Sequence, residues 1–259
     1  MSKPNQMDRR VAIVGVAQTE YQESRPDRRA AELAFEVTEE VLRLTGLTNK
    51  DLDVRITCSQ DYLDGRGISD CPISEAVGAQ YASEEKVAAD GAFAVRYGLI
   101  KVLSGHYDVV LVMGQCKESK VNQNQIANLA FDPIYQRQLG FDFLSAAAMQ
   151  ANRYMHKYGI TREQCAKVVV KNLRNARNNP YAQRAMDITV EDVLQAEMLS
   201  YPIGYLDAKP ISDGACAMIL AKEEVASQLT DRPVWIRGMG SCYDAYYLGD
   251  RDLSDCDAL

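Results

Sequence analysis

The feature that most constrains this chain is an uninterrupted apolar run at residues 109–114, with the sequence VVLVMG. Such a run, without alternating polar residues, is typical of a central strand that is parallel to its neighbours and covered on both faces. Similar apolar segments recur along the chain, at residues 11–17, 54–58, 213–221 and 233–238. Amphipathic helices are predicted between them, at residues 28–44, 92–103 and 223–229. This alternation predicts an α/β layered fold.

Residues 121–201 interrupt the alternation and are mostly helical in pattern. The helices predicted here are at residues 143–158, from 161 towards 178, and at 189–199, and a short helix is predicted earlier at 74–81. Thr161 and Gln164 have the spacing of a capping box. We expect this insertion to form a cap over the substrate.

Charge and cysteine usage narrow the range of functions. The chain has 29 basic and 36 acidic residues, which give a net charge of −7. An acidic protein binds nucleic acids and anionic membranes poorly, and no apolar stretch approaches the roughly 20 residues that span a bilayer. The seven cysteines are widely spaced without a CxxC pair, and there are two histidines. We therefore expect a soluble, cytoplasmic protein without a metal site or a disulfide framework.

Common catalytic motifs are absent: the chain has no Walker A loop, no GxSxG and no HExxH. Five segments instead resemble the thiolase superfamily, in its lipid-transfer-protein (sterol-carrier) branch of acetyl-CoA acetyltransferase-like proteins. They are residues 11–19, 104–114, 154–163, 178–182 and 206–217, of which the last, LDAKPISDGACA, is the most specific match. The resemblance implies a thiolase-like layered αβαβα fold. Its parts would be an N-terminal α/β half at 10–120, a helical loop domain at 121–204, and an incomplete C-terminal half at 205–259.

The resemblance also implies the chemistry. Thiolase-like enzymes make or break a carbon–carbon bond beside a coenzyme A thioester, which is their substrate, and they need no bound cofactor. In the cysteine-dependent members, a thiolate at a helix N-terminus accepts the acyl group. Here the corresponding segment reads Ala88-Ala89-Asp90-Gly91, and the stretch with the family's catalytic histidines would lie beyond Leu259. We therefore expect acyl transfer or carbon–carbon cleavage by a route without the cysteine.

Asp90, Tyr246 and Tyr247 are the candidate catalytic residues. Asp90 precedes a predicted helix, where it either acts on the substrate as a base or caps the helix. Tyr246 and Tyr247 follow the last predicted strand, and a pre-organised phenol can donate a proton to a developing alkoxide or enolate. Packing in a core or an interface is the alternative role for these rings. Cys116, just after the central strand, is either a displaced thiol or a small buried hydrophobe.

His156, Arg174 and Arg177 are the candidate coenzyme A contacts. The resemblance places the helix that carries His156 beside the pantetheine tunnel. Arg174 and Arg177 are helical neighbours in a basic run, which either binds phosphates or forms a solvated helix face. The other histidine, His106, is expected in a surface turn.

Three hypotheses stay open for the state in which the chain works. In the first, the chain is an active subunit that acts on an acyl-CoA, which includes a retro-aldolase for β-hydroxyacyl-CoA that works with a small zinc-ribbon/OB-fold partner. In the second, it is a catalytically inactive subunit of a thiolase heteromer. In the third, it is a fragment of a longer enzyme. The expected partners are an acyl-CoA substrate and either a second copy, a thiolase paralogue or the zinc-ribbon/OB-fold protein, with no nucleic acid and no membrane.

Overall fold

The computed structural model describes residues 9–68, 71–88 and 90–255. Ala89, Cys256 and Leu259 lie outside the described residues. The chain divides into two compact units. An α/β unit contains residues 9–121 and 212–239, and a helical unit contains residues 122–211 and 240–255.

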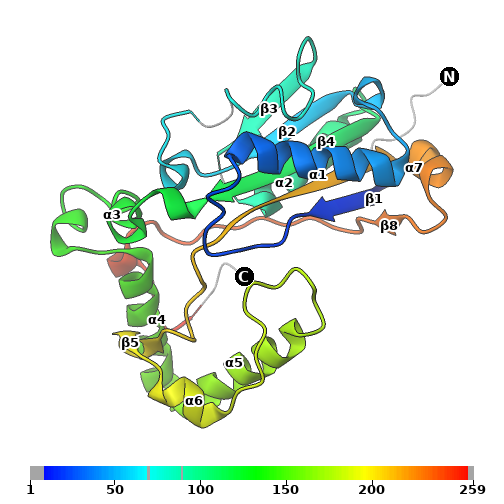
Figure 1. The fold of residues 1–259 in the computed structure, drawn as a ribbon. Coiled ribbons are helices and arrows are strands. Elements are labelled where there is room, and N and C mark those ends of the chain that lie inside the picture. The colour runs from blue at the N-terminus through cyan, green and yellow to red at the C-terminus, as the bar shows by residue number, and fades with distance from the viewer. Residues whose placement is uncertain (1–8, 69–70, 89, 256–259) are drawn as a thin grey trace. The chain divides into compact units, whose positions relative to one another are not determined.

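A six-stranded mixed sheet forms the centre of the α/β unit, in the order β3-β2-β4-β7-β1-β8 (Figure 1). Its strands are β1 (Val11–Gln18), β2 (Val54–Cys58), β3 (Ser83–Val87), β4 (Val109–Lys117), β7 (Asp213–Lys222) and β8 (Val234–Trp235). β2 is parallel to both β3 and β4, whereas β7 is antiparallel to both β4 and β1. The apolar run at 109–114 is therefore a central strand as predicted, but it is parallel to only one of its two neighbours.

The path of β7 explains why the compact units are not continuous in sequence. β7 follows residues 122–211 of the helical unit along the chain, yet it lies in the sheet between β4 and β1. Residues 212–239 therefore group with residues 9–121. This grouping differs from the linear division into 10–120, 121–204 and 205–259.

Helices cover both faces of the sheet. α1 (Ala30–Thr45) and α7 (Glu223–Leu229) pack on one face, and α2 (Gly91–Ser104) packs on the other. Alternate residues of β4 serve the two faces: Leu111 and Met113 lie in the cluster with α1, and Val110 and Val112 lie in the cluster with α2. The prediction of an α/β layered fold is confirmed.

α2 approaches the sheet closely because a glycine lies at its contact point. A Cβ atom on Gly98 would lie 2.8 Å from Val112 Cγ2 and 2.9 Å from Leu220 Cδ1. Contacts that short do not occur between real side chains without displacement of the neighbours. The missing side chain therefore sets how near α2 lies to β4 and β7.

The α-helices described in the helical unit each begin at a side-chain cap. The elements of this unit are α3 (Gln123–Asn128), η5 (Arg137–Leu139), α4 (Phe143–Tyr158), α5 (Arg162–Ala176), α6 (Val190–Gln195), β5 (Met198–Ser200), β6 (Ile203–Gly204) and η6 (Leu248–Asp250). The predicted capping box of Thr161 and Gln164 is confirmed at the start of α5. No helix within the described ranges is long and apolar enough to cross a membrane.

Two predicted helices differ from the structure, and one strand was missed. Residues 74–81 form turns instead of a helix. β3 was missed because its sequence, SEEKV, is charged, as edge strands often are. The predicted helix at 189–199 ends at Gln195, and residues 198–200 form β5, which pairs with β6.

Candidate functional site

Asp90 is the N-cap of α2. Its Oδ1 accepts hydrogen bonds from the backbone N–H groups of Ala92, at 2.9 Å, and Phe93, at 3.3 Å. The side chain is exposed, and the capping role that the sequence suggested is confirmed. Both capping bonds use Oδ1, so capping does not occupy the second carboxylate oxygen.

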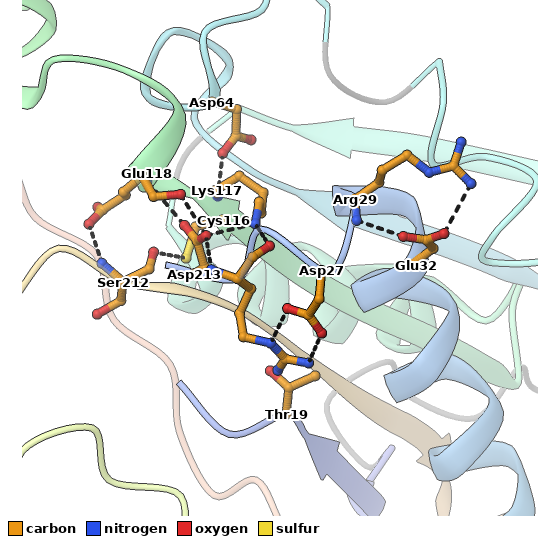
Figure 2. A network of polar contacts seen from close by, with 12 residues as sticks. Thr19, Asp27, Arg29, Glu32, Asp64, Cys116, Lys117, Glu118, Ser212 and Asp213 are labelled. Atoms are coloured by element: carbon orange, nitrogen blue, oxygen red, sulfur yellow. Dashed lines mark hydrogen bonds and ion pairs between the residues drawn. The ribbon is translucent and has the colours of Figure 1, made fainter. Parts of the chain in front are cut away.

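A buried ion pair lies where β4 ends and β7 begins (Figure 2). Lys117 Nζ is 2.7 Å from Asp213 Oδ2, and both side chains are almost fully excluded from solvent. The same ammonium group donates to the backbone carbonyl of Arg25 at 2.6 Å. A charge buried this deeply needs a partner, because its removal from water otherwise costs several kcal/mol or more.

Asp213 accepts three further hydrogen bonds. They come from the backbone N–H of Arg25 at 2.8 Å and from the backbone N–H and hydroxyl of Ser119 at 3.0 and 2.7 Å. Burial raises the pKa of the Asp213 carboxyl, but Lys117 and these donors outweigh it and hold the pKa below its ordinary value. The network therefore joins the loop after β1 to the ends of β4 and β7.

A second buried carboxyl, Asp64, lies in the same network and behaves differently. It accepts the backbone N–H of Lys117 at 2.8 Å and the side-chain amide of Gln115 at 2.9 Å. Burial is the largest influence on Asp64 and raises its pKa above the ordinary value. Gln115 Oε1 is buried without a hydrogen-bond partner among the described residues.

Cys116 is a protonated thiol in this environment. Its Sγ donates to the carbonyl of Ser212 at 3.2 Å. Burial, followed by the nearby carboxylates of Glu118, Asp64 and Asp213, raises its pKa to about 12. Since the thiolate is the nucleophilic form, this setting argues against Cys116 as a displaced catalytic thiol and favours the structural interpretation.

Tyr246 and Tyr247 lie together in the helical unit. Their ring centroids are 5.1 Å apart in an edge-on arrangement. The Tyr246 hydroxyl donates to the carbonyl of Ala130 at 3.0 Å, and the Tyr247 hydroxyl donates to Asp132 Oδ2 at 3.3 Å. The charge of Asp132, with a smaller effect of burial, raises the pKa of Tyr247. At neutral pH the phenol is therefore a proton donor.

The three candidate coenzyme A contacts are exposed and lie on α4 and at the end of α5. His156 is on α4, where its Nδ1 is 3.5 Å from Arg153 Nη1. Arg174 is in the last turn of α5, and Arg177 follows its end. Asp187 lies 3.3 Å from Arg174 Nε and 3.2 Å from Arg177 Nη1, so it bridges the two guanidinium groups. This bridge holds two cations together on the surface.

The structure therefore brings together some of the candidates. Tyr246 pairs with Tyr247, and Arg174 pairs with Arg177 through Asp187. Asp90 belongs to the α/β unit, whereas these four belong to the helical unit. Within the described ranges, no group of three or more His, Cys, Asp or Glu side chains is placed to hold a metal ion.

Sequence reasoning missed the network of Asp64, Lys117 and Asp213. The available signals were two polar residues at strand ends: Lys117, three positions after the apolar run at 109–114, and Asp213, at the start of another apolar segment. The sequence gives no sign that these two residues pair, because 96 positions separate them.

The family model for the thiolase N-terminal domain matches residues 11–193. The chain belongs to the thiolase family. It is 34% identical, over 96% of its length, to an acetyl-CoA acetyltransferase of Methanothermobacter thermautotrophicus, of which it covers 67%. A steroid side-chain-cleaving aldolase of Thermomonospora curvata is 28% identical over 92% of this chain, which covers 63% of that protein. The resemblance to thiolases is thus confirmed.

A solved structure of an "Ltp2-ChsH2(DUF35) aldolase" has the same thiolase fold. It superposes with a TM-score of 0.76 at 25% identity, over 94% of this chain and 65% of that one. The chain therefore spans about two thirds of the length of the thiolase relatives it matches.

Proposed function

We propose that the chain acts on a β-hydroxyacyl-CoA and cleaves its Cα–Cβ bond by a retro-aldol reaction that needs no cysteine. The observation that carries the proposal is Asp90, which caps α2 in the segment that resembles the site of the thiolase nucleophile. That position offers a carboxylate in place of a thiol, and its Oδ1 already accepts the backbone N–H groups of Ala92 and Phe93. A covalent acyl-enzyme on α2 is therefore not part of the reaction.

The reaction is balanced without an oxidant or a reductant. The β-hydroxyl gives its proton to a base, and its carbon–oxygen bond becomes a carbonyl. The Cα–Cβ bond breaks, and its electron pair passes to the thioester enolate, which takes a proton at Cα. The products are an aldehyde or ketone and a shorter acyl-CoA. Enzymes commonly supply such proton transfers with a positioned acid and a positioned base.

Two sets of residues are assigned to this chemistry. Tyr246 and Tyr247 are the proposed acid–base pair, because their rings lie together and their hydroxyls are held by Ala130 and Asp132. Asp90 is the second proposed group, with the carboxylate oxygen that is not used for capping as its proton acceptor. His156, Arg174 and Arg177 are proposed to contact coenzyme A, the two arginines through its phosphates.

The proposed assembly is a heteromer with a small zinc-ribbon/OB-fold protein. It is supported by the solved relative, whose name joins a second component, ChsH2(DUF35), to Ltp2. Purification of the chain with and without the product of a neighbouring gene of that class tests the assembly. Light scattering would then show a homodimer, a heteromer, or a pair with a thiolase paralogue.

The activity is tested with a panel of β-hydroxyacyl-CoA thioesters, with mass spectrometry of the products. Tyr247→Phe is expected to lower kcat by about 100-fold or more, because it removes the proton donor but keeps the ring. Asp90→Asn keeps a good N-cap and removes the base. Tyr243→Phe, a change of the same kind on an exposed neighbour, is the matched control and should stay within about twofold of the parent.

A second candidate function is acyl transfer between β-ketoacyl-CoA and coenzyme A. The observation in its favour is the 34% identity to an acetyl-CoA acetyltransferase. The same panel with β-ketoacyl-CoA and free coenzyme A separates the two functions. Turnover of this class alone would overturn the aldolase proposal, and turnover of neither class would favour the inactive subunit.

A further inference from the structure

Asp132 connects the turn that follows it to the phenol pair, Tyr246 and Tyr247. Its Oδ2 accepts the hydroxyl of Tyr247 at 3.3 Å. Its Oδ1 accepts the backbone N–H groups of Ile134 and Tyr135, at 3.0 and 2.7 Å. The two oxygens of this carboxylate therefore have separate roles, because one holds the turn and the other bonds to a proposed catalytic hydroxyl.

The turn that begins at Asp132 fixes the carboxylate in place. The backbone carbonyl of Asp132 accepts the N–H groups of Gln136 and Arg137, at 3.2 and 2.8 Å. The guanidinium of Arg137 donates to two backbone carbonyls of the same loop, at 2.9 and 3.2 Å. An aspartate at the start of such a turn ordinarily stabilises the turn. That structural role uses Oδ1 and does not explain the bond between Oδ2 and Tyr247.

The bond to Asp132 sets the direction of the Tyr247 hydroxyl. An ionised carboxylate only accepts hydrogen bonds, so the phenol hydrogen lies towards Asp132. The phenol oxygen can then accept a hydrogen bond from a substrate hydroxyl. The hydroxyl of Tyr246 has a different partner, because it donates to the backbone carbonyl of Ala130, which is not a proton acceptor at neutral pH.

We infer that Asp132 is a positioning residue that makes Tyr247 the base of the proposed retro-aldol reaction. The inference rests on the proposed function, because it takes the phenol pair as the site of reaction. The O–H bond of the β-hydroxyl breaks and its proton binds the Tyr247 oxygen, while the original phenol proton passes to Asp132 Oδ2. The β-carbon–oxygen bond becomes a carbonyl, and the electron pair of the Cα–Cβ bond passes to the thioester enolate. The enolate takes a proton at Cα, and Asp132 returns its proton to solvent.

The charge of Asp132 argues against a simpler base, the Tyr247 phenolate. That charge is the largest of the influences that raise the pKa of the Tyr247 phenol above its ordinary value. The other titratable groups that act on Tyr247 are the phenols of Tyr246 and Tyr135, which also raise its pKa. The phenol is therefore protonated at neutral pH. A protonated phenol accepts a second proton only if it passes its own to another group, and Asp132 is the acceptor that it contacts.

Asp132→Asn separates this role from a structural one. The Oδ1 atom of asparagine can accept the same two backbone N–H groups and keep the turn, but the amide cannot receive the phenol proton. We expect kcat for a β-hydroxyacyl-CoA to fall about 100-fold, with KM unchanged. Asp142→Asn, at the N-cap of α4, is the matched control because asparagine is also a good cap. Its kcat should stay within about twofold of the parent.

Asp132→Ala completes the comparison, because it removes the bonds to the turn as well as the proton acceptor. A purely structural role predicts a parent-like kcat in Asp132→Asn and a loss in Asp132→Ala. The inference predicts that kcat falls in both variants.

The pKa of Tyr247 gives a readout that does not require turnover. Fluorine NMR of the full chain labelled with 3-fluorotyrosine can follow it, with the Tyr247 resonance assigned by its loss in Tyr247→Phe. This pKa should be lower in Asp132→Asn than in the parent, because the charge that raises it is gone. It should be unchanged in Asp142→Asn.

The outcomes separate this inference from the proposed function. An unchanged Tyr247 pKa in Asp132→Asn, or a parent-like kcat, would overturn the inference even if a β-hydroxyacyl-CoA is cleaved. A loss of kcat in Asp90→Asn alone would then assign the proton transfer to Asp90. A lower Tyr247 pKa together with a reduced kcat would support the inference. A lower Tyr247 pKa without turnover of any thioester would support the pairing of Asp132 with Tyr247, and the proposed function alone would fail.

Discussion

The α/β unit buries branched aliphatic side chains, whereas the buried apolar residues described in the helical unit are mainly alanines. Leu33, Ile56 and Ile219 are fully enclosed in the first unit. In the second, the buried apolar residues are Ala127, Ala148, Ala166, Val193 and Leu248. Burial stabilises in proportion to apolar area. The α/β unit can therefore enclose an ion pair and its polar partners, while the helical unit buries fewer large apolar side chains among the described residues.

Among the substitutions considered, Asp213→Ala is expected to destabilise the α/β unit most strongly. It leaves Lys117 buried without a counter-charge, and loss of one partner of a buried pair costs about 3–5 kcal/mol. The free energy of unfolding can be measured by urea titration, with Trp235, the single tryptophan of the chain and part of β8, as the reporter. Asp27→Ala is the control, because its pair with Arg25 is exposed at the carboxylate.

A double variant keeps this prediction testable if Asp213→Ala does not fold. Lys117→Met with Asp213→Leu removes both charges and fills the space with apolar atoms. Such replacements are often neutral or stabilising, so the double variant should be more stable than Asp213→Ala. The opposite order would mean that the ion pair is not what holds the ends of β4 and β7.

Gly98→Ala is expected to destabilise the α/β unit by about 1 kcal/mol. Overpacking against Val112 and Leu220 destabilises the fold by about 1–3 kcal/mol, and the higher helix propensity of alanine offsets up to about 1 kcal/mol of this loss. Gly91→Ala is the matched control on the same helix, because its Cβ would meet nothing within 4 Å. It should be neutral or stabilising. Equal effects of the two substitutions would show that α2 is not closely packed on the sheet.

Asp64→Asn is expected to change how the stability of the α/β unit depends on pH. The folded pKa of Asp64 is raised, so its contribution to stability is complete below the unfolded pKa of about 3.9 and is lost as pH rises through the folded pKa. The stability of Asp64→Asn relative to the parent should therefore increase with pH. Asp213 has a lowered pKa, so its contribution is lost as pH falls through that value, and Asp213→Asn should show the opposite slope. Parallel slopes would contradict these directions.

Local patterns made many elements of both units predictable. The apolar run at 109–114, the cap at Asp90 and the box at Thr161 depend on residues within a few positions of one another, and each was found from the sequence. β3 was not, because its charged sequence is stabilised by its parallel pairing with β2 instead of by burial on both faces. Edge strands of this kind have no apolar signature.

The sites depend on partners that are distant in sequence. The hydroxyl of Tyr247 bonds to Asp132, which is 115 positions away in the sequence, and Lys117 bonds to Asp213, which is 96 positions away. No spacing rule connects such pairs, so the sequence could name Tyr246, Tyr247 and Cys116 but not their environments. The raised pKa of Cys116, which decides against a thiolate there, follows from carboxylates that only the fold brings near it.

Asp187→Asn tests the helical side of the comparison and has the smallest expected effect on stability. Its bonds to Arg174 and Arg177 lie on the surface, where solvent and salt screen ion pairs, so the unfolding midpoint should not change measurably. The substitution removes a carboxylate that competes with phosphates for both guanidinium groups. Coenzyme A should therefore bind more tightly to Asp187→Asn and more weakly to Arg174→Gln, with both differences shrinking as salt rises. If none of these variants alters coenzyme A affinity, the basic run is a solvated helix face.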